Sequence, residues 1–547
     1  MKFLLLMLLA SGLALYSYAQ KNDSSKIQDI DSFLVRQEGL NKFNGTVLVA
    51  QKGQILLKKG YGYADFENKK ANDSSGIFQI YSITKTFTSS MIFILIEQGK
   101  LSLDDRLSKF YPAFPNGDNI TLEHLLTHTS GINDTTDDPN ARETESYRVE
   151  RFGKNTVNFA PGEGWSYCNG GYQLLGYIIA KVTGVSYEEA VRKHIFSPLG
   201  MSASGFDFKN LPSPEKVTAY HVFTEEIKEK ASLYDSTGPY AAGSIYSTVG
   251  DLYKYYRGFR SSRIISKISQ DIAFNPSKTN KGYGYGWQLR QDSLKSKVIS
   301  HSGGAAGFRS NFAMIPEDDI CVIILNNHEN ANTEFLTGRI IDILSGKVFE
   351  PVREVKLKDA DLKKFVGVFS VQEPPRMIHT SVLAGRLAVE VSGQGKQPVI
   401  ATGETVFFHE EADAILEFAS DENGVFSEIT ISLGSRKMVG KRIASSWGLV
   451  GSATPKGWDD SLPDLKFSED SVRKGLWILK DIALEKGEIK FRLNNDWNIN
   501  YGDTKGDGVL EMNGENIKVE AGVYDLILDL TDESSPRYRL LKKAGGR

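Results

Sequence analysis

The chain has 547 residues, yet it holds only two cysteines and no excess of charge of either sign. Cys168 and Cys321 cannot build a disulfide framework, and their spacing fits no zinc-binding pattern. We favour two small buried thiols, although an oxidising compartment would also allow them to pair. The net charge of -3 and the charged fraction of 24% exclude a polybasic nucleic-acid binder and a disordered chain. Stability must therefore come from hydrophobic cores, and the length suggests about three.

Long apolar runs are also missing, except at the start of the chain. Residues 1–19, "MKFLLLMLLASGLALYSYA", combine one lysine, an apolar stretch and small residues at positions 17 and 19, which is typical of a cleaved signal peptide. No other stretch approaches the roughly 20 apolar residues of a membrane-spanning helix, and no cysteine lies near the cut to carry a lipid. We predict cleavage after Ala19 and a periplasmic or secreted protein without an integral membrane segment. A retained anchor is the alternative.

The next part of the chain reads as strands, then helices, then strands. Residues 45–63 alternate apolar residues around a Lys-Gly turn, which predicts a β-hairpin. Helical patterns follow from about residue 82 to residue 200, and one of them stops at Gly184 as a helix with a glycine C-cap does. Residues 297–327 contain three apolar runs separated by turn residues. This order predicts an α+β domain over residues 20–350, with a helical cluster packed on a sheet.

Two small all-β domains are expected after this α+β domain. Residues 351–444 show short alternating runs separated by Gly, Asp and Asn, which predict a small β-barrel or sandwich. Residues 445–547 again carry short strands and glycine-rich turns. Four of the six tryptophans gather in this last segment: Trp447, Trp458, Trp477 and Trp497.

One short stretch places a hydroxyl and an amine at the start of an apolar helix. Ser82 and Lys85 in "FQIYSITKTFTSSMIFILIEQGK" are three residues apart and therefore share a helix face. The apolar residues behind them should lower the pKa of Lys85 and make it a proton acceptor for the serine. The free N–H groups of the helix start would suit an oxyanion. Alone, this spacing also fits a capping serine followed by a surface lysine.

Two further motifs give the first one a context. "PGEGWSYCNGGY" carries Tyr167 and Asn169 as Y-x-N before a helix, and "SHSGG" carries His301 and Gly303 as H-x-G at the end of a strand. In this order the three motifs resemble the active-site set of the serine β-lactamase and penicillin-binding-protein superfamily, with H-x-G in place of K-T-G. The stretches "LLTHTSGI", "FSPLGM", "AAGSIYST" and "YGYGW" extend the resemblance over about residues 30–345. The chain is most similar to the class C β-lactamase-like branch, which includes D-aminopeptidases, D,D-carboxypeptidases and esterases.

The resemblance implies a β-lactamase-like fold, with an antiparallel sheet and a helical cluster, and a division of catalytic roles. Ser82 would be the nucleophile that forms an acyl-enzyme. Lys85 and Tyr167 would share the proton transfers, with Tyr167 as a phenolate stabilised by the cation. The backbone N–H groups of Ser82 and Gly304 would form the oxyanion hole, and Asn169 would hold the substrate amide.

The third motif sets the expected substrate contacts. His301, followed by Gly303, would orient a substrate carboxylate or carbonyl. Because the histidine replaces a permanent cation, recognition of a terminal carboxylate is in doubt. The resemblance therefore favours a D-amino-acid peptide or amide, with an ester as runner-up and a β-lactam as a further alternative. A non-catalytic glycan- or peptidoglycan-binding protein that kept the fold is the alternative of another class.

Neither a metal nor a cofactor is expected. His124 and His128 are four residues apart on a helical pattern, but the glutamate and the third ligand of a metalloprotease motif are missing. Cys168 lies between Tyr167 and Asn169, so alternation should point its side chain away from the pocket. We expect a small peptide, amide or ester as the partner, and no nucleic acid.

The two C-terminal segments carry looser resemblances. Residues 352–443 are similar to the small lipocalin-like barrel appended to many β-lactamase-related hydrolases. Residues 447–541 resemble starch-binding modules of the SusE type, which implies a possible glycan partner, since aromatic rings stack on sugars while polar side chains bind the hydroxyls. The glycan-binding candidates are Trp458, Lys490, Arg492, Asn495 and Trp497. For Trp477 we favour a place in the core.

Overall fold

The computed structural model resolves the chain into two compact units, Met1–Pro351 and Val352–Arg547. It describes residues 25–134, 144–154, 157–223, 228–293, 295–347, 352–373, 375–383, 385–391, 396–473, 475–531 and 536–543. The predicted signal peptide, residues 1–19, lies outside these ranges, so its cleavage stays a prediction. No helix within the described ranges is long and apolar enough to cross a membrane.

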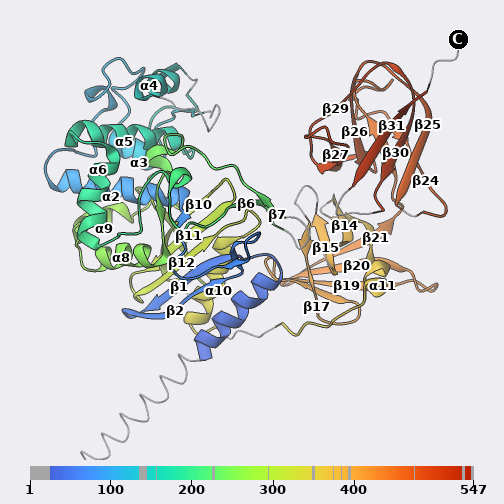
Figure 1. Cartoon of the computed structure of the whole chain (residues 1–547), viewed down its shortest axis with the longest axis horizontal. Helices are drawn as coiled ribbons and strands as arrows, with labels where there is room; N and C mark the ends of the chain where they lie inside the picture. Colours follow the sequence, from blue (N-terminus) through green and yellow to red (C-terminus); the bar gives the residue numbers. More distant parts are fainter. Residues whose placement is uncertain are drawn as a thin grey trace, which may run out of the picture. The chain divides into compact units, whose positions relative to one another are not determined.

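The first unit is built on a six-stranded antiparallel sheet with the order β2-β1-β12-β11-β10-β9 (Figure 1). Its strands are β1 Gly45–Gln51, β2 Gln54–Tyr61, β9 Gln288–Gln291, β10 Lys297–Ala305, β11 Phe308–Ile315 and β12 Ile320–Asn326. Short strands form three separate pairs: β3 Tyr63–Asp65 with β4 Lys70–Ala71, β5 Phe78–Gln79 with β8 Tyr246–Ser247, and β6 Tyr220–Phe223 with β7 Lys228–Lys230. The predicted hairpin and the three predicted strands after residue 297 are both present.

Helices cover both faces of this sheet (Figure 1). The helices are the segment 25–39, α2 Thr84–Glu97, α3 Leu122–Leu126, α4 Glu145–Lys154, α5 Asn169–Thr183, α6 Tyr187–Val191, α7 Ser197–Leu199, α8 Val249–Arg260, α9 Lys267–Ala273 and α10 Thr333–Leu344. Single turns are η1 Tyr81–Ile83, η2 Leu107–Lys109, η3 Arg192–Phe196, η4 Phe208–Asn210 and η5 Tyr240–Ala242.

Strand β12 shows why the sheet needs two helical layers. Ile323 and Leu325 enter a core shared with α2, α5 and α8, while Val322 and Ile324 enter a core shared with α10 and the segment 25–39. Successive side chains of a strand point to opposite faces, so a continuous apolar run is stable only when both faces are covered.

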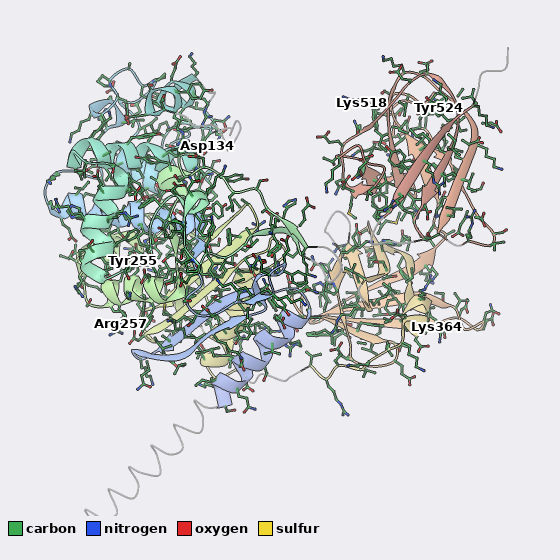
Figure 2. All side chains as sticks on the ribbon, in the orientation of Figure 1. Asp134, Tyr255, Arg257, Lys364, Lys518 and Tyr524 are labelled. Atoms are coloured by element: carbon green, nitrogen blue, oxygen red, sulfur yellow. The ribbon has the colours of Figure 1, made fainter. Side chains whose placement is uncertain are left out.

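Helix α2 crosses the centre of the first core. Its residues from Thr84 to Leu95 are buried, as is typical of a helix that is apolar all round. Tyr255 of α8, labelled in Figure 2, stacks on Phe87 of α2 with ring centroids 4.0 Å apart. Helix α5 ends at Gly184 with a φ of 73°, which confirms the predicted glycine C-cap.

The second unit begins with a sheet that closes into a barrel. After α11 Asp359–Leu362 and η6 Lys363–Phe365, nine strands pair in the order β16-β15-β14-β13-β21-β20-β19-β18-β17. They are β13 Gly367–Gln372, β14 Pro375–Leu383, β15 Arg386–Val391, β16 Gln397–Pro398, β17 Ile400–Ala401, β18 Val406–His409, β19 Ala414–Ser420, β20 Phe426–Leu433 and β21 Arg436–Ile443. The two edge strands, β16 and β17, are separated only by Val399. The edges therefore lie together, and the sheet must curl around its apolar core.

The rest of the second unit is a β-sandwich. One sheet has the order β23-β22-β26-β27-β28, with β29 also paired to β26, and the other has the order β24-β25-β30-β31. Leu449 and Phe491 of the first sheet share a core with Trp477 and Leu526 of the second, so Trp477 is a core residue as predicted. The strands are β22 Trp447–Val450, β23 Leu465–Lys466, β24 Ser468–Glu469, β25 Leu476–Leu484, β26 Gly487–Leu493, β27 Asp496–Gly502, β28 Glu511–Met512, β29 Ile517–Val519, β30 Gly522–Asp529 and β31 Arg537–Lys542.

Candidate active site

Ser82 lies in the tight turn η1, directly before α2 and against the end of β10. The preceding residue, Tyr81, is buried with a φ of 44°, a backbone conformation that non-glycine residues rarely adopt and that often marks functional sites. The Ser310 hydroxyl donates to the carbonyl of Ile80 at 3.0 Å and fixes the turn to the sheet. A Cβ on Gly303 would lie 2.1 Å from that carbonyl oxygen and 3.0 Å from the Ser82 nitrogen. Only glycine at position 303 therefore allows this close approach.

Lys85 is fully buried, and its amine faces three oxygen atoms. The Nζ atom lies 3.0 Å from Ser82 Oγ, 2.7 Å from Asn169 Oδ1 and 2.9 Å from the carbonyl oxygen of Ala242. Burial lowers the pKa of Lys85 to about 7. A neutral amine has two N–H groups and one lone pair. It can therefore donate to Asn169 and Ala242 while accepting the Ser82 proton.

Tyr167 lies beside both the nucleophile and Lys85. Its hydroxyl hydrogen-bonds Ser82, and its ring centroid lies 4.7 Å from Lys85 Nζ. Burial of the hydroxyl raises the pKa of Tyr167 above its ordinary value. This desolvation opposes the phenolate that was expected, while Tyr167 stays 36% exposed, and the protonation state of Tyr167 stays a prediction.

The amino end of α5 brings a carboxylate close to this group. Asn169 is the first residue of α5, and Asp134, labelled in Figure 2, accepts the N–H of Gly170 at 2.7 Å. Burial raises the pKa of Asp134. The negative charge of Asp134 in turn raises the pKa of Lys85 and so opposes the lowering caused by the burial of the lysine. Because Asn169 Oδ1 is bonded to Lys85, the role of Asn169 toward a substrate amide stays a prediction.

His301 is almost completely buried in the middle of β10, not at the end of the strand as predicted. Its Nδ1 lies 2.7 Å from the Ser302 carbonyl oxygen, and its Nε2 lies 3.0 Å from the Tyr283 hydroxyl. Burial, together with the charge of Lys85, lowers the pKa of His301 to about 3. Both ring nitrogens are engaged inside the protein, so the expectation that this ring orients a substrate group is corrected. Gly304 follows Gly303 beside the nucleophile, and its oxyanion role stays a prediction.

The comparisons with known proteins agree with this geometry. Residues 37–345 match the protein family described as Beta-lactamase. Penicillin-binding protein 4* of Bacillus subtilis is 30% identical over 431 residues, which cover 73% of this chain and 94% of that protein. The chain belongs to the β-lactamase family.

Solved structures of this family share the fold. The octameric penicillin-binding protein homologue from Pyrococcus abyssi is 26% identical, with a TM-score of 0.55 over 76% of this chain and 99% of that one. FmtA from Staphylococcus aureus is 25% identical, with a TM-score of 0.52 over 60% of this chain and 90% of that one. The first unit is thus a β-lactamase-family domain with the fold of a serine hydrolase, and the second adds small all-β structure, as predicted.

Two residues behind this β-lactamase-family site, His128 and Tyr283, were not identified from the sequence as parts of the site. His128 Nε2 lies 3.1 Å from the Tyr283 hydroxyl, and His128 Nδ1 accepts the N–H of Cys168 at 3.0 Å. Both residues belong to stretches that carried the family resemblance, "LLTHTSGI" and "YGYGW". The resemblance of these two stretches to the family could have pointed to both residues, but it did not show that their side chains are in contact.

The remaining reactive side chains have structural places. His124 forms a capping box with Thr121 at the start of α3, away from the His128 ring. Within the described residues, no group of three or more His, Cys, Asp or Glu side chains could hold a metal ion. Cys168 and Cys321 are buried and free, and the Cys168 sulfur accepts the N–H of Gly171.

The glycan candidates of the sandwich separate into two groups. Arg492 has no exposed side-chain surface, and it binds Asp464 through two nitrogens at 2.7 Å and also Asp460. The prediction that Arg492 binds sugar is therefore corrected, because its donors are engaged in a buried ion pair. Lys490 donates to Asn500, and the Asn495 side-chain oxygen accepts the N–H of Asp464.

The two tryptophans among the candidates do lie together. Trp458 is 37% exposed, and its ring centroid is 5.9 Å from that of Trp497. The indole N–H of Trp497 donates to Asp460 at 2.9 Å, and the Arg492 guanidinium lies 4.6 Å from its ring centroid. The structure thus places the aromatic pair beside Arg492, whose donors are already engaged by Asp460 and Asp464. Sugar binding by the other candidates stays a prediction.

Proposed function

We propose that this protein is a serine hydrolase that cleaves an amide or ester through an acyl-enzyme on Ser82. Neutral Lys85 takes the hydroxyl proton as Ser82 Oγ attacks the carbonyl carbon. The backbone N–H groups of Ser82 and Gly304 stabilise the oxyanion. Tyr167, as a neutral phenol, donates its proton to the leaving group, and the Lys85 ammonium replaces that proton. Water then releases the acyl group by the same steps in reverse.

One observation carries this proposal: a lysine with a pKa of about 7 faces the serine hydroxyl at 3.0 Å. At neutral pH a large fraction of this amine is uncharged. A general base works best when its pKa lies near the working pH. The non-catalytic alternative has no use for such a lysine, because burying an amine without a carboxylate in hydrogen-bond contact costs stability.

The covalent step can be tested by labelling. Wild type incubated with a fluorophosphonate or a fluorescent β-lactam should gain one adduct mass, and Ser82→Ala should gain none. Ser102→Ala, which removes an exposed serine outside the site, is the matched control and should label like wild type. If wild type and Ser82→Ala both stay unlabelled and inactive, the non-catalytic glycan- or peptidoglycan-binding alternative stands.

For the substrate we propose a D-amino-acid peptide or amide, ahead of an ester and of a β-lactam. The neutral, fully engaged His301 supports this order, since the third motif offers no cation to a terminal or ring carboxylate. A comparison of kcat/KM for a D-alanyl p-nitroanilide, p-nitrophenyl butyrate and nitrocefin ranks the three classes. Nitrocefin turnover near the diffusional range of ~10⁸ M⁻¹s⁻¹ would reverse the order.

Export is part of the proposal and rests on the sequence of residues 1–19. Expression with the native leader in a bacterial host should give an extracytoplasmic protein whose intact mass corresponds to a chain beginning at Gln20. An uncleaved chain in the membrane fraction would favour the retained anchor.

A second candidate function, glycan binding, rests on the pair of the exposed Trp458 and the half-buried Trp497. Two adjacent indoles offer apolar faces on which sugar rings can stack. The full chain should be retarded in a native gel containing amylopectin, and Trp458→Ala should remove the retardation without changing hydrolysis. Tyr147→Ala, which removes an exposed aromatic of the catalytic unit, should not. No retardation on starch, pullulan, dextran or peptidoglycan would reduce this module to a spacer.

A further inference from the structure

A continuous row of hydrogen bonds runs behind the site from the Y-x-N loop to β10. It joins the Cys168 N–H, the His128 ring, the Tyr283 hydroxyl, the His301 ring and the Ser302 carbonyl, with each separation between 2.7 and 3.1 Å. His128 and His301 are each 1% exposed, and Tyr283 is 3% exposed. The row connects the second catalytic motif to the third through two residues, His128 and Tyr283, that belong to neither.

The chemistry of the two ends fixes the protons on both imidazole rings. A backbone N–H can only donate, so His128 Nδ1 must be a bare acceptor, and a neutral His128 carries its proton on Nε2. A carbonyl oxygen can only accept, so His301 Nδ1 must carry a proton, and a neutral His301 has a bare Nε2. The Tyr283 hydroxyl then accepts from His128 and donates to His301. The same arrangement follows from either end.

His128 also forms hydrogen bonds with Ser166 and Cys168, the two residues that flank Tyr167. Its ring accepts the N–H of Cys168, and its backbone carbonyl accepts the N–H of Ser166 at 3.0 Å. Its ring centroid lies 4.4 Å from that of Tyr167. His128 achieves these contacts with a φ of 60°, a backbone conformation that is uncommon for residues other than glycine. The chain thus accepts local strain at the position that holds Tyr167.

We propose that His128 and Tyr283 are positioning residues that lock His301 as a neutral imidazole protonated on Nδ1 and hold Tyr167 against Ser82. The kinetic part of this inference rests on the proposed hydrolase function, whereas the proton order does not. A locked, neutral His301 leaves Lys85 as the group that titrates near neutral pH. The titratable groups that face the two rings are Lys85, Tyr167, Tyr172, Tyr283 and Cys168. Burial raises the pKa of the cysteine thiol and of the three tyrosine hydroxyls. None of these four groups therefore ionises near neutral pH.

The proton order is tested by ¹⁵N NMR of the histidine rings in the unliganded full chain. The chain has eight histidines, so single His→Gln variants can assign the signals. At pH 7 the spectra should show His128 with its proton on Nε2 and His301 with its proton on Nδ1. Both rings should remain neutral between about pH 5.5 and 8. The opposite tautomer of either ring, or a charged ring in this range, would overturn the lock.

The positioning role is tested by removing one hydroxyl. Tyr283→Phe should lower kcat by about 10²-fold with a smaller change in KM, because a displaced Tyr167 affects the reaction more than binding. The matched control is Tyr285→Phe in the same loop, whose hydroxyl donates to Glu123 at 2.8 Å and whose loss should change kcat less than about twofold. An unchanged kcat in Tyr283→Phe, with an unchanged melting temperature, would refute the role. If wild type proves inactive, the proposed function fails and the NMR result alone decides the lock.

Discussion

Two buried cations in this protein have opposite surroundings. Lys85 in the first unit faces a serine hydroxyl, an amide oxygen and a backbone carbonyl. Arg492 in the sandwich faces Asp464, which is itself fully buried, and Asp460. Both side chains have lost contact with water, but only the arginine received carboxylates in hydrogen-bond contact in exchange.

This difference separates a reactive group from a structural one. Burial without a directly bonded carboxylate makes the charged form of Lys85 unstable and leaves an amine that can take a proton. Burial with a bidentate carboxylate keeps Arg492 charged and fixes the loop that carries Asp460 and Asp464 against β26. The nature of the acceptor, rather than the depth of burial, decides what a buried cation does.

The largest expected effect comes from removing the reactive cation. Lys85→Met should lower kcat/KM by about 10²–10⁴-fold, because no other base replaces the amine beside Ser82. Its melting temperature should stay equal or rise, since a desolvated amine is replaced by an apolar chain of similar length. Lys100→Met, at an exposed position, is the control for both measurements. Activity that survives in Lys85→Met would remove the distinction between the two cations.

Removing the structural cation should give the reverse result. Arg492→Met leaves the buried Asp464 without its bidentate partner and should cost about 3–5 kcal/mol of unfolding free energy in the second unit. Urea unfolding followed by tryptophan fluorescence measures this loss, and hydrolysis should be unchanged. Asp464 also accepts from the buried amine of Lys456 at 2.7 Å, so the variant that should recover much of the stability removes all three charges: Arg492→Met/Asp464→Leu/Lys456→Met. A single variant as stable as wild type would show that the ion pair is dispensable.

A double variant tests whether Lys85 works alone or with Tyr167. Tyr167→Phe should lower kcat by about 10²-fold, because the leaving group loses its acid. If the lysine and the phenol act as one unit, adding Lys85→Ala should bring the loss little beyond that of the worse single variant. Losses that multiply fully would assign the two groups to separate steps.

The smallest expected effect is a shift of the pH profile. Since the neutral amine of Lys85 is the active form and its pKa is about 7, kcat/KM should rise with pH and level off above that value. The charge of Asp134 raises the pKa of Lys85, so Asp134→Asn should move the rising limb to lower pH. If the rising limb of the kcat/KM profile does not shift in Asp134→Asn, a group other than Lys85 controls the pH dependence.

Local sequence signals predicted much of the fold, and the motifs identified residues that the structure brings together at the candidate site. The hairpin of β1 and β2, the strands β10 to β12 and the cap at Gly184 all rest on patterns a few residues long. Ser82 and Lys85 share a turn of chain, so their contact followed from spacing alone. Their partners Tyr167 and His301 were placed by motif resemblance.

The remaining features depend on contacts that no local pattern contains. His124 and His128 were compared as neighbours on one helix, but α3 ends at Leu126 and the φ of 60° at His128 turns its ring elsewhere. The desolvation that raises the pKa of the Tyr167 hydroxyl arises only in the folded structure. Arg492 looked like a sugar ligand because its partner Asp464 comes 28 residues earlier in the sequence.

The pairing of β1 with β12 has a consequence for how the protein is made. The side chain of Asn326 accepts the N–H of Asn44 across 282 residues of sequence, and β1, which pairs with β2 on one edge, finds its second partner only after nearly the whole first unit has been synthesised. The barrel repeats this order, since its first strand, β13, pairs with its last, β21. Contacts of such long sequence separation form slowly. Each nascent sheet therefore waits with one free strand edge, and slowing translation before residues 320 and 436 should increase aggregation of the growing chain.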